Sequence, residues 1–177
     1  MPDRWVALLR GINVGGNNPV NMKDLVRSLT ATGYSDVRTY INSGNVVFGS
    51  TQPPTEADLE AILDERFGFP IPVLLRDRAA YADTVASAPP EFADPGLRCD
   101  VMFLKDTTTP EAALAALPPL TEGVDQIWPG PRALYFARVA AQANRTRITR
   151  IVGTPIYREM SVRNWNTTRR LLDLLDA

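Results

Sequence analysis

The order of hydrophobic periods over the first 76 residues is the feature that most narrows what this chain can fold into. Four short segments alternate apolar and polar side chains or are apolar throughout, as strands do, and Ser43-Gly44 separates the second from the third. Two other segments place apolar side chains at helical spacing, and each begins at a capping residue, Asn21 or Thr55. The resulting order, β-α-β-β-α-β, is that of the split-βαβ or ferredoxin-like fold. The strands are expected at residues 4–10, 36–42, 45–48 and 71–76.

The second half of the chain repeats this order in part, in the pattern β-α-β-β-α. The similarity between the halves lies in the order of elements and not in the residues, as expected for a distant internal duplication. A helix capped by Thr109 has Pro110 at its first position, where a missing N–H costs nothing. Strands are expected at residues 98–104, 124–128 and 133–139, and helices from Thr109, over residues 144–152, and from Asn166 or Thr167.

These patterns predict an α+β chain of two ferredoxin-like (split βαβ) halves packed together. Residues 1–76 are expected to form the first half and residues 98–177 the second, which ends in a C-terminal helix. Residues 77–97 are expected to form a connecting helix followed by a proline-rich loop.

The absence of histidine constrains the chemistry more than any residue that is present. Without histidine there is no Ser-His-Asp triad, no imidazole metal ligand and no side chain with an ordinary pKa near neutrality. The single cysteine, Cys99, excludes an internal disulfide and a thiolate-rich zinc or iron–sulfur site. The sequence indicates no metal and no cofactor, and it names no reaction, so whether the protein is an enzyme stays open.

Charge is distributed unevenly along the chain. Residues 1–129 hold 10 basic and 17 acidic side chains, whereas residues 130–177 hold 9 arginines and 3 acidic side chains. A basic C-terminal third can attract an anionic ligand or nucleic acid, or it can pair with the acidic remainder of the fold. No run of about 20 apolar residues and no signal-peptide pattern is present, so we expect a cytoplasmic protein with no membrane partner.

A glycine loop at residues 11–16 follows the first expected strand. Its two outer glycines have the spacing of a P-loop, but Asn17 and Asn18 stand where a P-loop has lysine and a hydroxyl residue, which argues against a nucleoside triphosphatase. The glycines can instead let backbone N–H groups converge on an anion, with Arg10 as its charged clamp. The alternative is a loop in which the glycines only adopt positive φ and the asparagines bond the backbone.

Two further segments carry side chains suited to polar recognition. Ser43-Gly44-Asn45 forms a hairpin turn, and without histidine a nucleophilic serine has no base there. Arg163-Asn164-Trp165-Asn166 precedes the last helix, whose N-terminus favours anions, and Trp165 either stacks on a ring or packs at the helix entry.

Three segments together resemble a bacterial family of unknown function, DUF1697. They are LRGINVGG at residues 9–16, YINSGNVVF at residues 40–48 and RNWNT at residues 163–167, and the resemblance extends over nearly the whole chain. It implies an α+β fold of two ferredoxin-like halves, and it implies no activity.

We therefore expect a small phosphate- or carboxylate-bearing ligand, bound in one cleft where Arg10, the glycine loop and residues 163–166 meet. One alternative is a nucleic-acid-binding module that uses the arginines of the C-terminal third, such as Arg145, Arg147 and Arg150. Another is an interaction or scaffold protein without a ligand, and the oligomeric state is not indicated. The candidate ligand-binding residues are Arg10, Gly11, Asn13, Gly15, Gly16, Ser43, Asn45, Arg163, Asn164 and Asn166.

Overall fold

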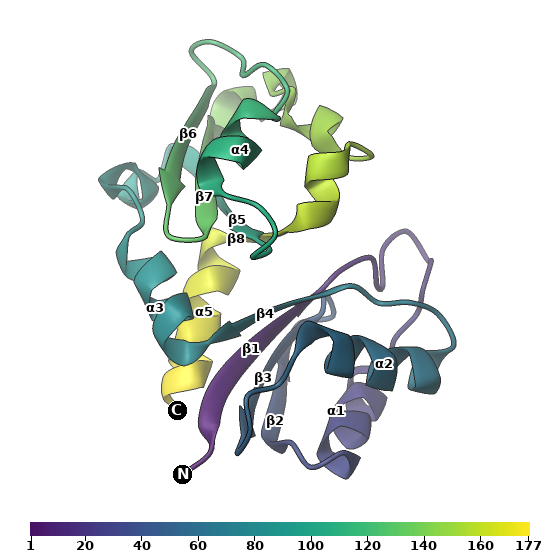
Figure 1. Ribbon diagram of the computed structural model, residues 1–177. Coiled ribbons are helices and arrows are strands. Elements are labelled where there is room, and N and C mark those ends of the chain that lie inside the picture. The colour runs from purple at the N-terminus through teal and green to yellow at the C-terminus, as the bar shows by residue number, and fades with distance from the viewer. The chain divides into compact units, whose positions relative to one another are not determined.

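A computed structural model describes residues 1–177 and contains two four-stranded antiparallel sheets (Figure 1). The first sheet has the strand order β2-β3-β1-β4, which is the order of a ferredoxin-like half. Its elements are β1 (Asp3–Leu9), α1 (Met22–Ala31), β2 (Ser35–Tyr40), β3 (Asn45–Ser50), α2 (Glu56–Phe67) and β4 (Val73–Asp77).

The second sheet repeats the arrangement, with the strand order β6-β7-β5-β8. The expected α+β fold of two ferredoxin-like halves is therefore confirmed. The helix α3 (Arg78–Ala86) and the 3-10 helix η1 (Pro90–Ala93) precede this sheet. Its elements are β5 (Leu97–Leu104), α4 (Pro110–Ala115), β6 (Asp125–Gly130), β7 (Ala133–Val139), three 3-10 helices η2 (Ala140–Arg145), η3 (Ile148–Ile151) and η4 (Pro155–Glu159), β8 (Met160–Asn164) and α5 (Trp165–Asp176).

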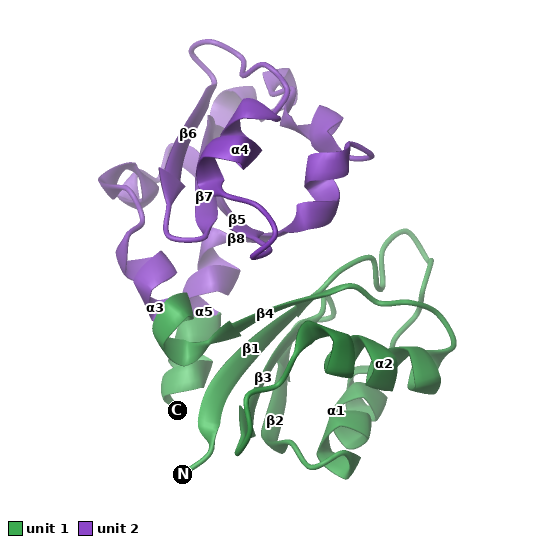
Figure 2. Ribbon diagram, in the orientation of Figure 1, with its two compact units in different colours: residues 1–81, 171–177 green, residues 82–170 purple.

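The chain divides into two compact units that do not coincide with two continuous segments (Figure 2). Unit 1 consists of residues 1–81 and 171–177, and unit 2 consists of residues 82–170. The division falls within α3 and again within α5, so each of these helices contributes residues to both units. None of the helices is both long enough and apolar enough to cross a membrane.

The core of unit 1 follows from the alternation of side chains along its strands. On β1, Ala7 and Leu9 belong to the apolar cluster shared with α1 and α2, which lie on one face of the sheet (Figure 1). Val6 and Leu8 point to the opposite face and are buried as well. Because both faces are buried, β1 has the nearly continuous apolar sequence typical of a central strand.

The core of unit 2 is built in the same way. Met102 and Leu104 of β5 pack with Leu134 and Phe136 of β7 in one apolar cluster. Ala113 of α4 covers this cluster. The 3-10 segments contribute Ile148, Ile151 and Ile156, and β8 contributes Met160.

The starts of the helices could be predicted because capping side chains mark them. The Asn21 side chain accepts hydrogen bonds from the backbone N–H groups of Lys23 and Asp24. Thr55 caps α2, as expected, and forms a capping box with Asp58, and the Thr109 hydroxyl caps α4. Caps are local signals that depend on a few neighbouring residues, so they can be recognised without knowledge of the fold.

The helix expected over residues 144–152 is wrong. This segment forms the end of η2 and all of η3, and Thr146 between them has an extended backbone. The β-branched residues Thr146, Ile148, Thr149, Ile151 and Val152 lower its helix propensity. Within this segment Ile148 and Ile151 are buried, while Arg145, Arg147 and Arg150 are exposed.

The strand β8 also differs from expectation, because residues 160–164 carried no strand prediction. It pairs with β5 and supplies the fourth strand of the second sheet, with Met160 opposite Leu104 and Val101 opposite Arg163. The strand has five residues and Val162 is its only β-branched residue, so its propensity signal is weak.

Candidate functional site

The glycine loop folds back on itself as a small hairpin. The Asn13 N–H donates to the carbonyl of Asn18 at 3.1 Å, and the Asn17 N–H donates to the carbonyl of Val14 at 3.0 Å. Gly15 and Gly16 form the tip, with φ angles of +58° and +79°. Two successive positive φ angles favour glycine strongly, so this turn itself requires the two residues.

Asn13 joins the glycine loop to the turn between β2 and β3. Its Nδ2 donates to the carbonyls of Asn42 at 2.8 Å and Val20 at 3.1 Å, and its Oδ1 accepts from the Val20 N–H at 2.8 Å. The Leu9 N–H also donates to the Gly44 carbonyl at 2.7 Å. The structure therefore brings two of the sequence motifs, the glycine loop and Ser43-Gly44-Asn45, to the same end of the first sheet.

Replacing Asn13 by Ala is expected to lower the free energy of unfolding by about 2–3 kcal/mol, because three hydrogen bonds of about 1 kcal/mol each are lost. Asn18→Ala is the matched control. Asn18 also has a positive φ, of +49°, but its side chain makes one hydrogen bond, to the Gly11 carbonyl. Urea denaturation should show the smaller loss for Asn18→Ala, and equal losses would contradict the bridging role of Asn13.

Two other candidate residues at this end of the first sheet, Asn45 and Arg10, form hydrogen bonds within the turn and beside the strand. Asn45 is fully buried, and its Nδ2 donates to the Tyr40 carbonyl at 3.1 Å and to the Ser43 Oγ at 2.9 Å. Arg10 follows β1 directly, and its N–H donates to the Pro72 carbonyl at 3.0 Å. A hollow of about 620 Å³ beside the glycine loop is lined by Asn13, Gly16 and Asn42, among others, and by one cation, Lys23.

The third motif lies in unit 2, at the junction of β8 and α5. Arg163 is a strand residue whose guanidinium donates to the Val162 carbonyl at 2.9 Å. Asn164 caps α5, since its Oδ1 accepts from the Thr167 N–H at 2.8 Å. The helix thus begins at Trp165 and not at Asn166 or Thr167. Arg10 belongs to unit 1 and Arg163 to unit 2, and the single cleft that would join them stays a prediction.

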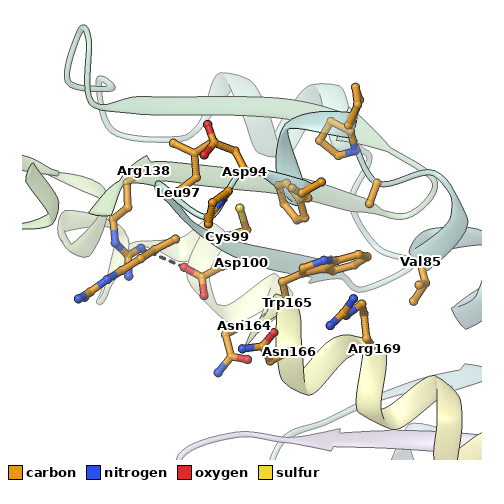
Figure 3. A pocket seen from close by; sticks show the side chains of 17 residues that line it. Val85, Asp94, Leu97, Cys99, Asp100, Arg138, Asn164, Trp165, Asn166 and Arg169 are labelled. Atoms are coloured by element: carbon orange, nitrogen blue, oxygen red, sulfur yellow. Dashed lines mark hydrogen bonds and ion pairs between the residues drawn. The ribbon is translucent and has the colours of Figure 1, made fainter. Parts of the chain in front are cut away.

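A pocket of about 800 Å³ in unit 2 is open beside the start of α5 (Figure 3). Two of the candidate residues, Asn164 and Asn166, line it, and Arg163 does not. The residues around it come from α3, η1 and the loops beside η1, the first part of β5, β7, the end of β8 and the first turns of α5. Those that bear charge or an amide or indole group are Asp94, Arg98, Asp100, Arg138, Asn164, Trp165, Asn166 and Arg169.

The acidic groups of this pocket already have partners. Asp100 and Arg138 form an ion pair at 2.9 Å, with side chains that are 19% and 22% exposed. Asp94 Oδ1 accepts the Gly96 N–H at 2.7 Å. Arg98 and Arg169 are exposed and form no ion pair. The pocket therefore presents two guanidinium groups without carboxylate partners.

Trp165 and Arg169 lie one helical turn apart on the same face of α5 (Figure 3). The guanidinium carbon of Arg169 lies 6.0 Å from the centroid of the Trp165 ring, at the outer range of a cation–π contact. Sequence reasoning identified Trp165 but missed Arg169. The i, i+4 spacing of the two residues was the signal that could have joined them.

Cys99 also lines the pocket and is buried. Burial raises the pKa of its thiol, and the nearby carboxylates of Asp100 and Asp94 raise it further. The thiol is therefore protonated at neutral pH. No three His, Cys, Asp or Glu side chains gather into a group that could hold a metal ion.

The wall of the pocket is fixed by an aromatic cluster around Phe92 of η1. The Phe92 ring meets Trp165, Tyr135 and Trp128 at steep angles, with centroid distances of 5.2, 5.7 and 6.3 Å. The Tyr135 hydroxyl donates to the Thr84 carbonyl of α3 at 2.5 Å. These contacts attach η1 and α3 to the second sheet.

Burial raises the pKa of Tyr135 to about 12, with a smaller contribution from Asp83. The unfolded chain loses this proton near pH 10, while the folded protein keeps it to about pH 12. The free energy of unfolding should therefore fall between these pH values, by at most about 1.4 kcal/mol per pH unit from this group. Urea denaturation at pH 9, 10 and 11 tests this, and Tyr135→Phe should remove part of the slope. Identical slopes in both proteins would contradict it.

Comparisons with known proteins agree with this architecture. Among solved structures, conserved bacterial protein SP0830 from Streptococcus pneumoniae is similar to this chain, with a TM-score of 0.83, 25% identity and 99% of each chain covered. Among curated proteins no relative was found. The family described as "Protein of unknown function (DUF1697)" matches residues 3–135, which include the glycine loop and the turn before β3. The chain therefore belongs to the DUF1697 family.

Proposed function

We propose that this protein binds a small anionic ligand, bearing a phosphate or carboxylate group, in the pocket of unit 2. The observation that carries the proposal is the pair Arg98 and Arg169, which line one pocket and have no carboxylate partner. A guanidinium group offers a planar fork of N–H donors that matches phosphate and carboxylate oxygens. Both groups are accessible to a ligand, since both side chains are exposed.

The charge distribution on the second sheet supports the same ligand class. Arg98 lies directly opposite Arg138 on neighbouring strands. Like charges in opposed positions repel one another, and Asp100 is paired with Arg138. Because Asp100 already compensates the charge of Arg138, Arg98 is the guanidinium of this opposed pair that is left to hold an anion.

The start of α5 supplies a further attraction. Helix N-termini carry a partial positive charge and favour anions. The 12-residue helix α5 begins at Trp165, and two of its first residues line the pocket. Asn166 contributes an exposed side-chain amide at the same place.

The proposal is tested by titrating inorganic phosphate and citrate into the protein by isothermal calorimetry. Arg98→Ala and Arg169→Ala are each expected to weaken binding about tenfold or more, the usual effect of losing a charge-assisted bond. Arg150→Ala is the matched control, because Arg150 is exposed and lies in η3 outside the pocket. Absence of binding, or the same affinity in all three variants, would overturn the proposal.

The wider form of the site, in which Arg10 and the glycine loop also contact the ligand, is a separate proposal. Arg10→Ala would weaken binding if the loop takes part, and it would leave the affinity unchanged if the pocket of unit 2 acts alone. The same titrations therefore decide between the two forms.

Nucleic-acid binding is the second candidate, favoured by the exposure of Arg145, Arg147 and Arg150 around two buried isoleucines. Such binding would weaken steeply between 50 and 200 mM salt, with a slope set by the number of phosphates contacted. A labelled single-stranded oligonucleotide in a polarisation assay measures this slope. A variant with alanine at all three arginine positions should bind the oligonucleotide more weakly. Binding as tight as that of the parent protein would contradict nucleic-acid binding by these arginines.

A further inference from the structure

We infer that the anionic ligand of the unit 2 pocket carries a flat heterocyclic ring beside its phosphate, as a mononucleotide does, and that this ring stacks on Trp165. The inference rests on the proposed anion binding and specifies its substrate class. Four features of the pocket support it. They are the volume of the pocket, the indole ring of Trp165 in its lining, the amide atoms without hydrogen-bond partners, and the spacing of Trp165 and Arg169 along α5.

The size of the pocket exceeds the needs of a simple anion. Its volume of about 800 Å³ lies in the range of sites for drug-sized ligands, roughly 300–1,000 Å³. An inorganic phosphate held by two arginines would leave most of this space to water. The pocket therefore has room for a ligand with a larger body beside its anionic group.

The indole of Trp165 provides a surface for that body. Trp165 is half-buried and lines the pocket (Figure 3). Phe92 meets it at an interplanar angle of 74°, so the two rings are not stacked face to face. The exposed Arg169 guanidinium lies over this indole at the outer range of a cation–π contact, so a flat ring can take its place on the indole. Such stacking does not require one particular base.

Uncommitted amide groups lie on both sides of Trp165 in the sequence. Asn166 uses neither its amide oxygen nor its amide nitrogen in a hydrogen bond, and Asn164 uses only its Oδ1, as the cap of α5. A carboxamide presents a donor beside an acceptor, which matches the edges of nucleobases. Figure 3 shows both side chains at the start of the helix, next to Trp165.

The spacing along α5 places the groups for ring and phosphate side by side. Trp165 and Arg169 are four residues apart, and the guanidinium lies 6.0 Å from the ring centroid. A ligand with a ring on the indole thus has a guanidinium within reach of a phosphate attached through a sugar. A ligand of two arginine-bound carboxylates would not need the indole.

The test compares four mononucleotides (AMP, GMP, CMP and UMP) with ribose 5-phosphate and inorganic phosphate by isothermal calorimetry. In the parent protein at least one mononucleotide should bind about fivefold or more tightly than ribose 5-phosphate, which is the contribution of one stacked base. Trp165→Leu should abolish this preference and leave the affinity for ribose 5-phosphate unchanged. Arg169→Ala should weaken the binding of both compounds.

Two controls keep the outcomes distinct. Trp165→Phe retains an aromatic face and should keep most of the preference, which also decides the case if Trp165→Leu does not fold. Trp128→Phe changes another neighbour of Phe92 outside the pocket lining and should change nothing. If all phosphate compounds bind equally, the ring inference is overturned and the anion proposal stands. If none binds, both are overturned.

Discussion

Replacing Gly44 by Ala should destabilise the protein by about 2–5 kcal/mol, through two additive causes. Gly44 has a φ of +84°, a conformation that costs an L-residue roughly 1–2 kcal/mol. A Cβ at this position would also lie 2.7 Å from the Leu9 Cβ and 3.1 Å from the Leu9 carbonyl oxygen. Neither atom belongs to the end of a flexible side chain, so the strand or the turn must move, at about 1–3 kcal/mol.

Gly15→Ala is the control that separates the two causes. Gly15 has a φ of +58°, and a Cβ there would meet nothing within 4 Å. Its replacement should therefore cost only the backbone term, about 1–2 kcal/mol. Urea denaturation of the two variants measures the difference, and equal losses would show that the contact with Leu9 has no energetic weight.

The second large effect is expected for Phe92→Ala, at about 3–5 kcal/mol. Phe92 is 7% exposed and contacts three aromatic rings, so its removal leaves a cavity among groups that are held by the second sheet and α5. The same change removes one wall of the pocket and should weaken binding of the ligand. Thermal unfolding and phosphate titration measure the two consequences.

Phe69→Ala serves as its comparison. Phe69 packs against the core of unit 1 but is only half-buried, so its loss should cost clearly less and should leave ligand binding unchanged. A smaller loss of stability for Phe92→Ala than for Phe69→Ala would be inconsistent with the central place of Phe92 in its cluster.

Local signals made the first half of the fold predictable from the sequence. Asn21 and Thr55 mark helix starts by hydrogen bonds to residues two or three positions away, and no distant part of the chain is needed to recognise them. The strand β8 is different. Its five residues become a strand because β5 offers them a partner more than fifty positions earlier in the chain, and a pairing of that kind is invisible to local pattern.

The same distinction applies to the candidate site. The glycine loop was recognisable as special, yet two readings of its residues remained open, and the bonds from Asn13 to the turn before β3 depend on the antiparallel pairing of β1 and β3. The pocket of unit 2 could not be assembled from the sequence. Arg98 stands at the start of β5 and Arg169 in the second turn of α5, and only the fold brings them to one pocket.

The division of α5 between the two units has a consequence for the order in which the protein can be completed during synthesis. Residues 171–177 belong to unit 1, where the Leu174 carbonyl accepts a hydrogen bond from Arg4 at 3.2 Å and Asp176 pairs with Arg78 at 2.6 Å. A ribosome delivers these residues only after all of unit 2 has been made. The unit that begins first is thus completed after unit 2, and its early residues must wait, incompletely covered, until residues 171–177 have been made.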